Sequence, residues 1–497
     1  MKCEKMKYKI FCLILLNAFS LNILFAQQNI DLNCLTIIVG KNASSDGSVI
    51  VAHNEDDWGK QIVNLYKSPQ RIHNEDEIIT LDNGGKINQI KNTNGFIWIE
   101  LPGMSVSDTY LNDKGVLITS DGCPSREDKP DSTDGGILYW IRRIIAERAE
   151  SAKQGVKLAG KLIEHYGYAS PGRSYTIADK NEAWVLAVVH GKYWVAQRVP
   201  DNQISVIPNY YTIREINLAD TNNFLGSSDI ISYAEKRGWY NSENNEKFDF
   251  AEVYTSKNSI NHPGNINRIW RGINLLSENV FNIKDKFPFS FKPYKKVEVT
   301  DLMNILRDHY ENSELDESKF YKFGNPHYKN YATICSEATQ YSFVAQLRNN
   351  LPVEIGSILW FTYYRPCLNL FTPIYLGIND FPNDFNYTDE QQAIKFHLHP
   401  KEEIFDSNSA LKYWDFVKLT NYVDKDFLTF YPSVKSQKDI LQNDLIIETK
   451  RFENRVMEIY LKDRESALDM ISGFSKDKLI QIHNTSKEFL NSIKIRK

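Results

Sequence analysis

The sequence predicts an α+β protein: a four-layer sandwich of helix, sheet, sheet and helix (αββα), with a helical extension at the C-terminus. Three observations predict this class. Short runs of β-branched residues occur after residue 33 and again after residue 172, and a pair of helical patterns separates them. Residues 433–497 are charged and carry apolar residues at helical spacing. Two sheets covered by helices accommodate this order of elements.

The first strands form a predicted β-hairpin. Residues 34–40 are rich in β-branched side chains, an Asp-Gly turn signal follows, and residues 48–52 form a second apolar run. The polar residues 53–57 come directly after it. The first residue of one antiparallel strand lies beside the last residues of its neighbour, so we expect these polar side chains next to Cys34.

Further helices and strands follow along the chain. Apolar residues at helical spacing predict helices at residues 136–149, 155–166 and 299–310. Alternating and β-branched residues predict strands at residues 173–178, 182–189 and 193–199. No repeat, low-complexity tract or linker divides the chain. We therefore predict one domain over residues 34–432, with residues 433–497 as a helical extension packed on it.

The composition is typical of a globular protein. Apolar residues make up 42% and charged residues 25% of the 497 positions, near the averages for soluble domains. The formal net charge is −4 and no long basic run occurs, which argues against nucleic acid as a partner.

Residues 1–26 have the pattern of a secretory signal peptide. A lysine-rich start is followed by an apolar run over residues 10–26 that ends in a small residue. A membrane anchor is the alternative, but a spanning helix needs about 20 strongly apolar residues. This run is shorter and contains two asparagines. We expect export to the periplasm or out of the cell, and no membrane association after cleavage.

Cys34 would be a nucleophile if it were the first residue of the mature chain. A thiol needs a base, and a free α-amine with a pKa of about 7.7–8.0 can accept its proton near neutral pH. Residues 27–33 would then be a short propeptide, because an amide nitrogen cannot act as this base. The alternative, from the residue alone, is a structural cysteine buried in a strand.

Several segments resemble one enzyme family. The Cys-led hairpin over residues 34–56 resembles the opening of the C69 dipeptidases, which are N-terminal nucleophile (Ntn) hydrolases related to secernins, penicillin V acylase and bile salt hydrolase. The resemblance continues through residues 112–116, 181–185, 194–200, 207–211, 267–271, 334–340 and 355–377. It implies the Ntn-hydrolase type of αββα sandwich and an exported cysteine dipeptidase that acts on small peptides.

The resemblance also implies catalytic roles near the hairpin. Cys34 matches the nucleophile, with its own α-amine as the base. Asp56 matches a carboxylate that orients this amine, with a surface turn residue as the alternative. His53 stands where relatives of the acylase type usually place an arginine beside the sulfur, and we expect it on the substrate-binding side. A protonated imidazole there would favour the thiolate over part of the pH range.

Three further residues resemble parts of the catalytic site. Asn112, in the turn at 112–116, resembles an oxyanion donor, although a hairpin-turn residue is the alternative reading of the same pattern. Asn209 resembles a second amide of the pocket. Arg271 resembles a distal active-site arginine, and Arg268 is the competing choice.

Other chemistries lack their motifs. The chain has no H-E-x-x-H, C-x-x-C or G-x-S-x-G pattern, which argues against a metallopeptidase, a zinc or redox site and an α/β-hydrolase. We expect neither metal nor cofactor. Cys335 and Cys367 are expected to pack in the interior, His327 shows no recognisable context, and Asp121 is expected in a solvated loop.

Two alternatives to a dipeptidase stay open. One is an N-acyl amide hydrolase similar to penicillin V acylase or bile salt hydrolase, which would need the same mature N-terminus. The other is a secreted binding protein of the same fold without catalysis, which the histidine at position 53 leaves possible. The sequence does not decide between a monomer and a homo-oligomer, or between autocatalytic and assisted removal of residues 27–33.

Overall fold

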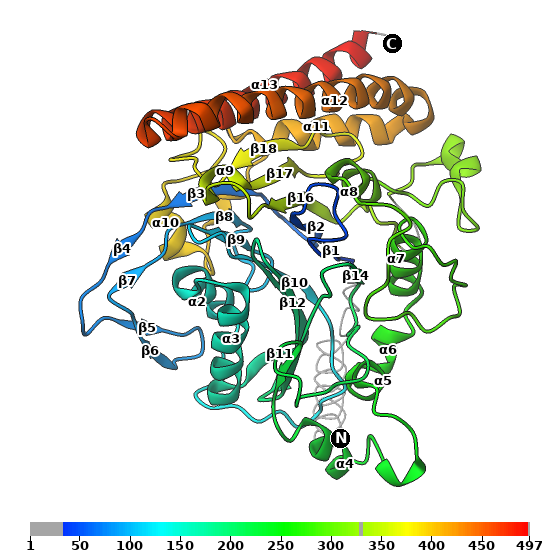
Figure 1. Ribbon diagram of the computed structural model, residues 1–497. Helices are drawn as coiled ribbons and strands as arrows, with labels where there is room; N and C mark the ends of the chain where they lie inside the picture. The colour runs from blue at the N-terminus through cyan, green and yellow to red at the C-terminus, as the bar shows by residue number, and fades with distance from the viewer. Residues whose placement is uncertain (1–32, 328–331, 496–497) are drawn as a thin grey trace, which may run out of the picture. The chain divides into compact units, whose positions relative to one another are not determined.

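The computed structural model describes residues 33–327 and 332–495 (Figure 1). The predicted signal peptide and residues 27–32 of the predicted propeptide lie outside these ranges. Two antiparallel sheets form the centre of the fold. In spatial order, the six-stranded sheet contains β14 (Ile204–Ile207), β1 (Leu35–Val39), β2 (Val49–Asp56), β16 (Thr339–Leu347), β17 (Ser357–Tyr363) and β18 (Thr372–Tyr375). The eight-stranded sheet contains β15 (Phe224–Gly226), β13 (Trp194–Arg198), β12 (Ala183–Gly191), β11 (Tyr168–Ala178), β10 (Leu117–Gly122), β9 (Thr109–Asn112), β8 (Phe96–Glu100) and β3 (Asn64–Ser68).

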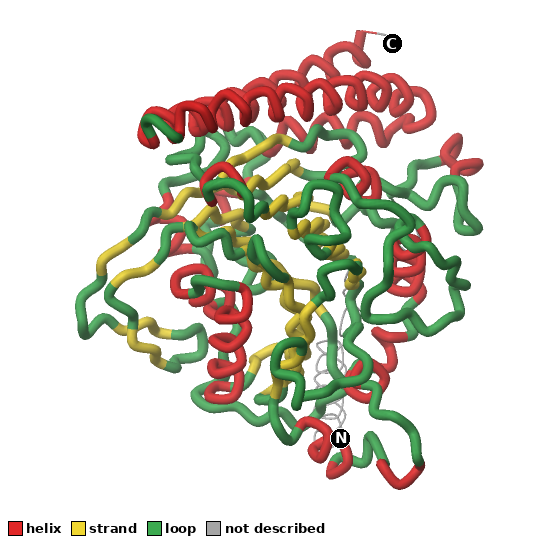
Figure 2. The backbone as a smooth tube through the Cα atoms, in the orientation of Figure 1, coloured by secondary structure: helices red, strands yellow, loops and turns green. Residues whose placement is uncertain are grey.

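Helices cover the outer faces of both sheets (Figures 1 and 2). The pair α2 (Trp140–Arg148) and α3 (Ala152–Tyr166) packs on the eight-stranded sheet, and α7 (Pro263–Asn274) and α8 (Val299–Leu306) lie against the six-stranded sheet. Alternation along β10 shows how the layers form, because Leu117 packs in the core between the sheets. Its neighbour Ile118 packs in the core beneath α2 and α3. The predicted four-layer αββα sandwich is confirmed.

Smaller elements connect these layers. They are β4 (Arg71–Ile72), β5 (Ile78–Thr80), β6 (Lys86–Asn88), β7 (Asn92–Thr93), α4 (Ile230–Lys236), η1 (Ser242–Asn244), α5 (Phe250–Tyr254), α6 (Lys257–Ile260), η2 (Ser318–Phe323), α9 (Val353–Gly356), α10 (Glu390–Phe396), η3 (Glu402–Phe405) and η4 (Asp424–Asp426). Two pairs of these short strands, β4 with β7 and β5 with β6, form separate ribbons.

The hairpin of β1 and β2 occupies the middle of the six-stranded sheet. The strand β2 runs to Asp56, past the predicted end at residue 52, because β16 pairs with it as far as Thr339 opposite Asp56. Every residue of both strands is buried. The polar end of β2 is therefore inside the protein, and each of its side chains needs a polar partner there.

Three helices form the C-terminal part of the described chain. They are α11 (Tyr413–Val423), α12 (Phe427–Tyr460) and α13 (Arg464–Ile495). The predicted start at residue 433 lies inside α12, next to Pro432, which the helix also contains. Burial of Phe427 and Phe430 against the body of the protein outweighs the one backbone hydrogen bond that proline cannot donate. No helix in the described part of the chain combines the length and apolarity needed to cross a bilayer.

Candidate active site

Cys34 lies immediately before β1, beside the polar end of β2. In the antiparallel pairing Leu35 is opposite Asn54, so Cys34 comes next to Glu55. The Sγ atom of Cys34 lies 3.6 Å from Oε1 of Glu55 and 3.6 Å from the main-chain oxygen of Asp56. The residue is only 3% exposed. The prediction that the hairpin brings a polar cluster to Cys34 is confirmed.

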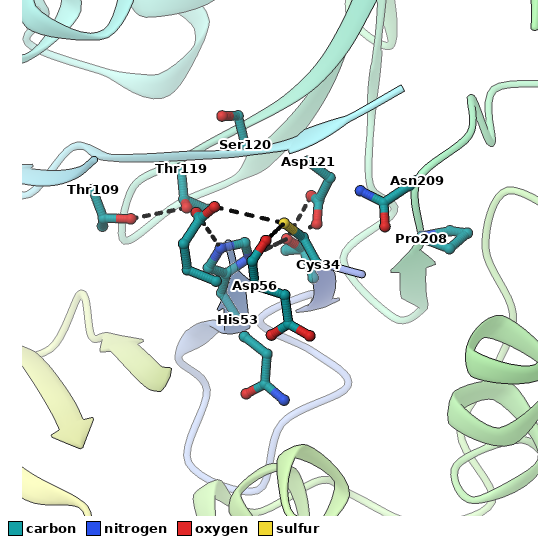
Figure 3. A network of polar contacts seen from close by, with 12 residues as sticks. Cys34, His53, Asp56, Thr109, Thr119, Ser120, Asp121, Pro208 and Asn209 are labelled. Carbon is teal, nitrogen blue, oxygen red and sulfur yellow. Dashed lines mark hydrogen bonds and ion pairs between the residues drawn. The ribbon is translucent and has the colours of Figure 1, made fainter. Parts of the chain in front are cut away.

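A chain of hydrogen bonds crosses from this strand pair to the facing sheet (Figure 3). The hydroxyl of Thr36 donates to Oδ2 of Asp121 at 2.6 Å, so its oxygen is free to accept from Nδ1–H of His53 at 2.8 Å. The other ring nitrogen of His53, Nε2, then carries a lone pair, and it lies 3.0 Å from Oε2 of Glu55. This arrangement requires a proton on Glu55, which donates to the imidazole.

Burial favours these same protonation states. Desolvation raises the pKa of Glu55 to about 8 and lowers the pKa of His53 to about 4. Desolvation is the main cause that raises the pKa of the Cys34 thiol well above its usual value, and the negative charge of Glu55 is the next largest cause. At neutral pH the network therefore consists of a neutral imidazole, a protonated Glu55 and a thiol.

His53 does not take the predicted position on the substrate-binding side. Its side chain is fully buried, and both ring nitrogens contact protein groups, so a substrate has no access to it. Burial lowers the pKa of His53 to about 4, which favours the neutral ring at neutral pH over the protonated imidazole considered from the sequence. A permanent positive charge comes instead from Arg173 on β11. Burial opposes that charge, but Tyr168, Tyr175, Glu55 and Cys34 together raise the pKa of Arg173.

Asp56 points to the other face of β2. Its Oδ2 accepts a hydrogen bond from the hydroxyl of Ser336, and desolvation raises the pKa of the carboxyl to about 7. Its Oδ1 is buried and has no hydrogen-bond partner within residues 33–327 and 332–495. An unpaired buried carboxylate oxygen is a ready acceptor for a further donor.

Asn209 lies on the opposite side of Cys34 from Glu55. In the pairing of β1 with β14, Thr36 is opposite Ile207, and extending this register by two residues places Cys34 opposite Asn209. Figure 3 shows the amide nitrogen of Asn209 turned towards the side of Cys34 and Asp121. This nitrogen, Nδ2, is buried and has no hydrogen-bond partner in the described part of the chain.

One arginine fixes the orientation of this amide. Arg268 on α7 is fully buried, and its Nη2 donates to Oδ1 of Asn209 at 2.8 Å. Its Nη1 donates at 3.0 Å to Oδ1 of Asn33, the residue before Cys34. Arg271, the predicted arginine, instead donates to both carboxylate oxygens of Asp308 at 2.9 and 2.8 Å. The structure therefore corrects Arg271 to the competing choice, Arg268.

Asn112 is a turn and helix-capping residue. Its amide nitrogen donates to the main-chain oxygens of Ala146 and Ala149 at 3.0 and 2.8 Å, at the C-terminal end of α2. Its Oδ1 accepts from the backbone N–H groups of Lys114 and Val116. Because both amide hydrogens are used, the predicted oxyanion role of Asn112 is wrong. The turn also lies at the far end of β10 from the contact with Thr36.

The sequence prediction missed Glu55, Asp121 and Arg173. Asp121 is fully buried at the end of β10, not in a solvated loop. Strand alternation could have identified Glu55, because residues two positions apart in a strand share one face, which places Glu55 on the same face as His53. His53 and Glu55 face the other sheet, whereas Asn54 and Asp56 bond to the segments around Ile334 and Ser336. No local pattern marks Arg173.

Replacing Glu55 with glutamine is expected to change how stability depends on pH. The raised pKa means that the folded protein holds a proton which the unfolded chain releases above its ordinary carboxyl pKa. Wild-type stability should therefore fall as pH rises from about 5 to about 8, by about 3–4 kcal/mol, whereas Glu55→Gln should lack this part of the slope. Thermal unfolding across this range measures the difference.

Glu465→Gln, at an exposed glutamate of α13, is the matched control and should follow the wild type. A constant difference in unfolding temperature between Glu55→Gln and the wild type at every pH would show that Glu55 is ionised in the folded protein.

Two dipeptidases are similar to this chain over most of its length. The chain is 29% identical over 385 residues to the probable dipeptidase of Salmonella dublin, covering 71% of this chain and 83% of that protein. It is 24% identical over 387 residues to dipeptidase A of Lactobacillus helveticus, covering 74% and 79%. A structure of penicillin V acylase from Agrobacterium tumefaciens is similar at 12% identity and a TM-score of 0.31, over 66% and 82% of the chains, which is too distant to bear on the fold or the chemistry. Residues 33–78 and 128–438 match the model of peptidase family C69, and the chain therefore belongs to this family.

Proposed function

We propose that this chain is an exported dipeptidase that hydrolyses the peptide bond of dipeptides with Cys34 as an N-terminal nucleophile. The dipeptidases among its relatives support the reaction class. One observation carries the rest of the proposal: the sulfur of Cys34 lies between Glu55 and the position of Asn209, whose amide nitrogen has no partner in the described chain. A nucleophile beside an unused donor is the arrangement that acyl transfer requires.

The base in this proposal is the α-amine of Cys34 after removal of the residues before it. Asn33 precedes Cys34 in the structure, so this nitrogen is an amide there, and Arg268 holds the Asn33 side chain in place. Cleavage between Asn33 and Cys34 would create an ammonium group next to the end of β2. The unpaired Oδ1 of Asp56 is a suitable acceptor for it, which supports the predicted role of Asp56.

In the first half of the reaction, the α-amine takes the thiol proton and the sulfur attacks the carbonyl carbon of the peptide bond. The C–N bond is still intact at this stage, and negative charge develops on the carbonyl oxygen. The Nδ2–H group of Asn209 would donate to this oxygen, with Arg268 fixing the amide through Oδ1. The ammonium then gives its proton to the leaving amine as the C–N bond breaks.

The second half releases the acyl group. The α-amine takes a proton from a water molecule, whose oxygen attacks the thioester carbon. The C–S bond breaks, and the proton returns to sulfur. The guanidinium of Arg173 would favour the thiolate in both halves, since the neutral His53 cannot.

The mature N-terminus is the first test of this mechanism. We expect that protein purified from an exporting host begins at Cys34, as determined by intact mass and N-terminal sequencing. An active enzyme that begins at residue 27 would rule out the α-amine as base. The Cys34→Ala chain analysed in the same way tells the two routes of maturation apart, because only autocatalytic removal of residues 27–33 depends on the thiol.

A substrate panel separates the remaining alternatives. Dipeptides with free N-termini compared with N-acyl amino acids distinguish a dipeptidase from an N-acyl amide hydrolase. A correctly matured chain that turns over neither class would instead match a binding protein of the same fold.

A further inference from the structure

Two histidines and two cysteines converge in the interior, outside the active site. They are His309, His327, Cys335 and Cys367, all four are buried, and their potential ligand atoms lie within 4.8 Å of one another. They come from four separate segments: the loop after α8, the segment after η2, the segment before β16, and the connection from β17 to β18. Both cysteines are free thiols.

The distances between these side chains match a tetrahedral metal site. A zinc ion with Zn–S of about 2.3 Å and Zn–N of about 2.0–2.1 Å separates its sulfur and nitrogen ligands by about 3.6 Å. Nε2 of His327 lies 3.3 Å from Sγ of Cys367 and 4.0 Å from Sγ of Cys335, on either side of this value. The two imidazole rings meet edge to face, with centroids 5.1 Å apart, so both can direct a nitrogen to a common point.

Both histidines are held in the orientation that a metal ligand needs. Nδ1 of His309 contacts Oε1 of Glu311 at 3.2 Å, and Nδ1 of His327 contacts Oδ1 of Asp424 at 2.8 Å. With the proton on Nδ1, each ring presents the Nε2 lone pair to the thiols. Nε2 of His309 is buried among the other three side chains, and His309 interacts with the thiol of Cys367.

We propose that His309, His327, Cys335 and Cys367 bind one zinc ion. Two thiolates and two imidazoles are a donor set that zinc prefers, and four protein ligands leave no position open for water or substrate, so the site is structural. The absence of a C-x-x-C motif led us to expect no metal. The fold brings together ligands that are spread over four segments, which linear spacing cannot reveal.

The proposed site is joined to the active site through the residues on either side of Cys335. The main-chain oxygen of Ile334 accepts a hydrogen bond from Nδ2 of Asn54 at 2.8 Å, and Ser336 donates to Asp56. A zinc ion that anchors Cys335 would hold both contacts in place. It would also fix the junction between α11 and α12, because Asp424, the partner of His327, lies between these two helices.

Metal analysis of the full chain tests the proposal. Protein dialysed against metal-free buffer is expected to retain about one zinc ion per chain, measured by inductively coupled plasma mass spectrometry. Cys335→Ser, Cys367→Ser and His309→Gln should lose it. Two matched controls should keep it: Cys123→Ser changes another buried thiol, and His483→Gln changes another buried histidine paired with a carboxylate, Asp415.

Two further measurements do not depend on the folding of ligand variants. Cobalt(II) introduced into wild-type protein should give the absorption bands of a tetrahedral cobalt–thiolate site. Glu311→Gln, which changes a carboxylate that contacts His309 and the hydroxyl of Tyr321 but none of the four proposed ligands, should lower zinc affinity by about 10–100-fold in a chelator competition. Folded wild-type protein that takes up no stoichiometric zinc, or that contains a Cys335–Cys367 disulfide, would overturn the proposal. Neither result depends on whether the chain is a dipeptidase.

Discussion

Replacing Cys34 with alanine is expected to abolish dipeptide hydrolysis, reducing kcat by roughly 10⁴-fold or more. In the proposed mechanism, the substitution removes the atom that forms the acyl intermediate and leaves the α-amine and Asn209 without a nucleophile to assist. The two chains should be compared with residues 27–33 deleted, so that a failure of maturation does not imitate a failure of chemistry. The measurement is kcat with a dipeptide substrate.

Cys123→Ser is the matched control for this substitution. Cys123 is also a buried free thiol, its Sγ contacts the main-chain oxygen of Pro208 at 3.6 Å, and a serine hydroxyl can donate to the same oxygen. This variant should keep most of its activity. If Cys34→Ala turned over dipeptides at the wild-type rate, the nucleophile would have to be another group, and the N-terminal mechanism would be wrong.

The second large effect is expected at Asn209. Asn209→Ala should lower kcat by about 10²–10³-fold with a much smaller change in KM, because the lost donor acts on charge that develops only in the transition state. Steady-state kinetics with a dipeptide separate the two parameters. Asn209→Ala also removes the Oδ1 acceptor of the buried Arg268, so some loss of fold stability is expected, and kcat should be compared per folded molecule after thermal unfolding has been measured.

Asn112→Ala provides the matched comparison. Asn112 is equally buried, but its amide makes four hydrogen bonds to the backbone of its own turn and of α2. Its loss should lower the unfolding temperature and leave kcat per folded molecule near the wild-type value. The opposite pattern, with kcat lost at Asn112 and retained at Asn209, would return the oxyanion role to the turn.

Local patterns were sufficient for the sandwich and for the position of Cys34. The alternation of the first two strands and the turn between them fix the register, and the register alone brings Cys34 to the end of β2. The C-terminal helices were also visible in the sequence, although α12 begins before the predicted start at residue 433. These features depend on contacts between residues that are close along the chain or in consecutive strands.

The choice between similar side chains required the tertiary structure. Arg268 and Arg271 lie on the same short helix, and only the packing of α7 against β14 shows which guanidinium reaches Asn209. The same holds for Asn112 and Asn209, which both occur near strand ends. Ligands from four segments, such as His309 and Cys367, leave no spacing signal at all.

The hydrogen bonds run in one direction, from Glu55 to His53, from His53 to Thr36 and from Thr36 to Asp121. A change at one of these positions alters what its neighbour must donate or accept, which limits the single substitutions that the family can accept. An arginine at position 53 has no acceptor lone pair, so it would force Glu55 to ionise and would leave Thr36 with a different partner. Positions 36, 53, 55 and 121 should therefore vary together among relatives, as a coupled set rather than as four independent sites.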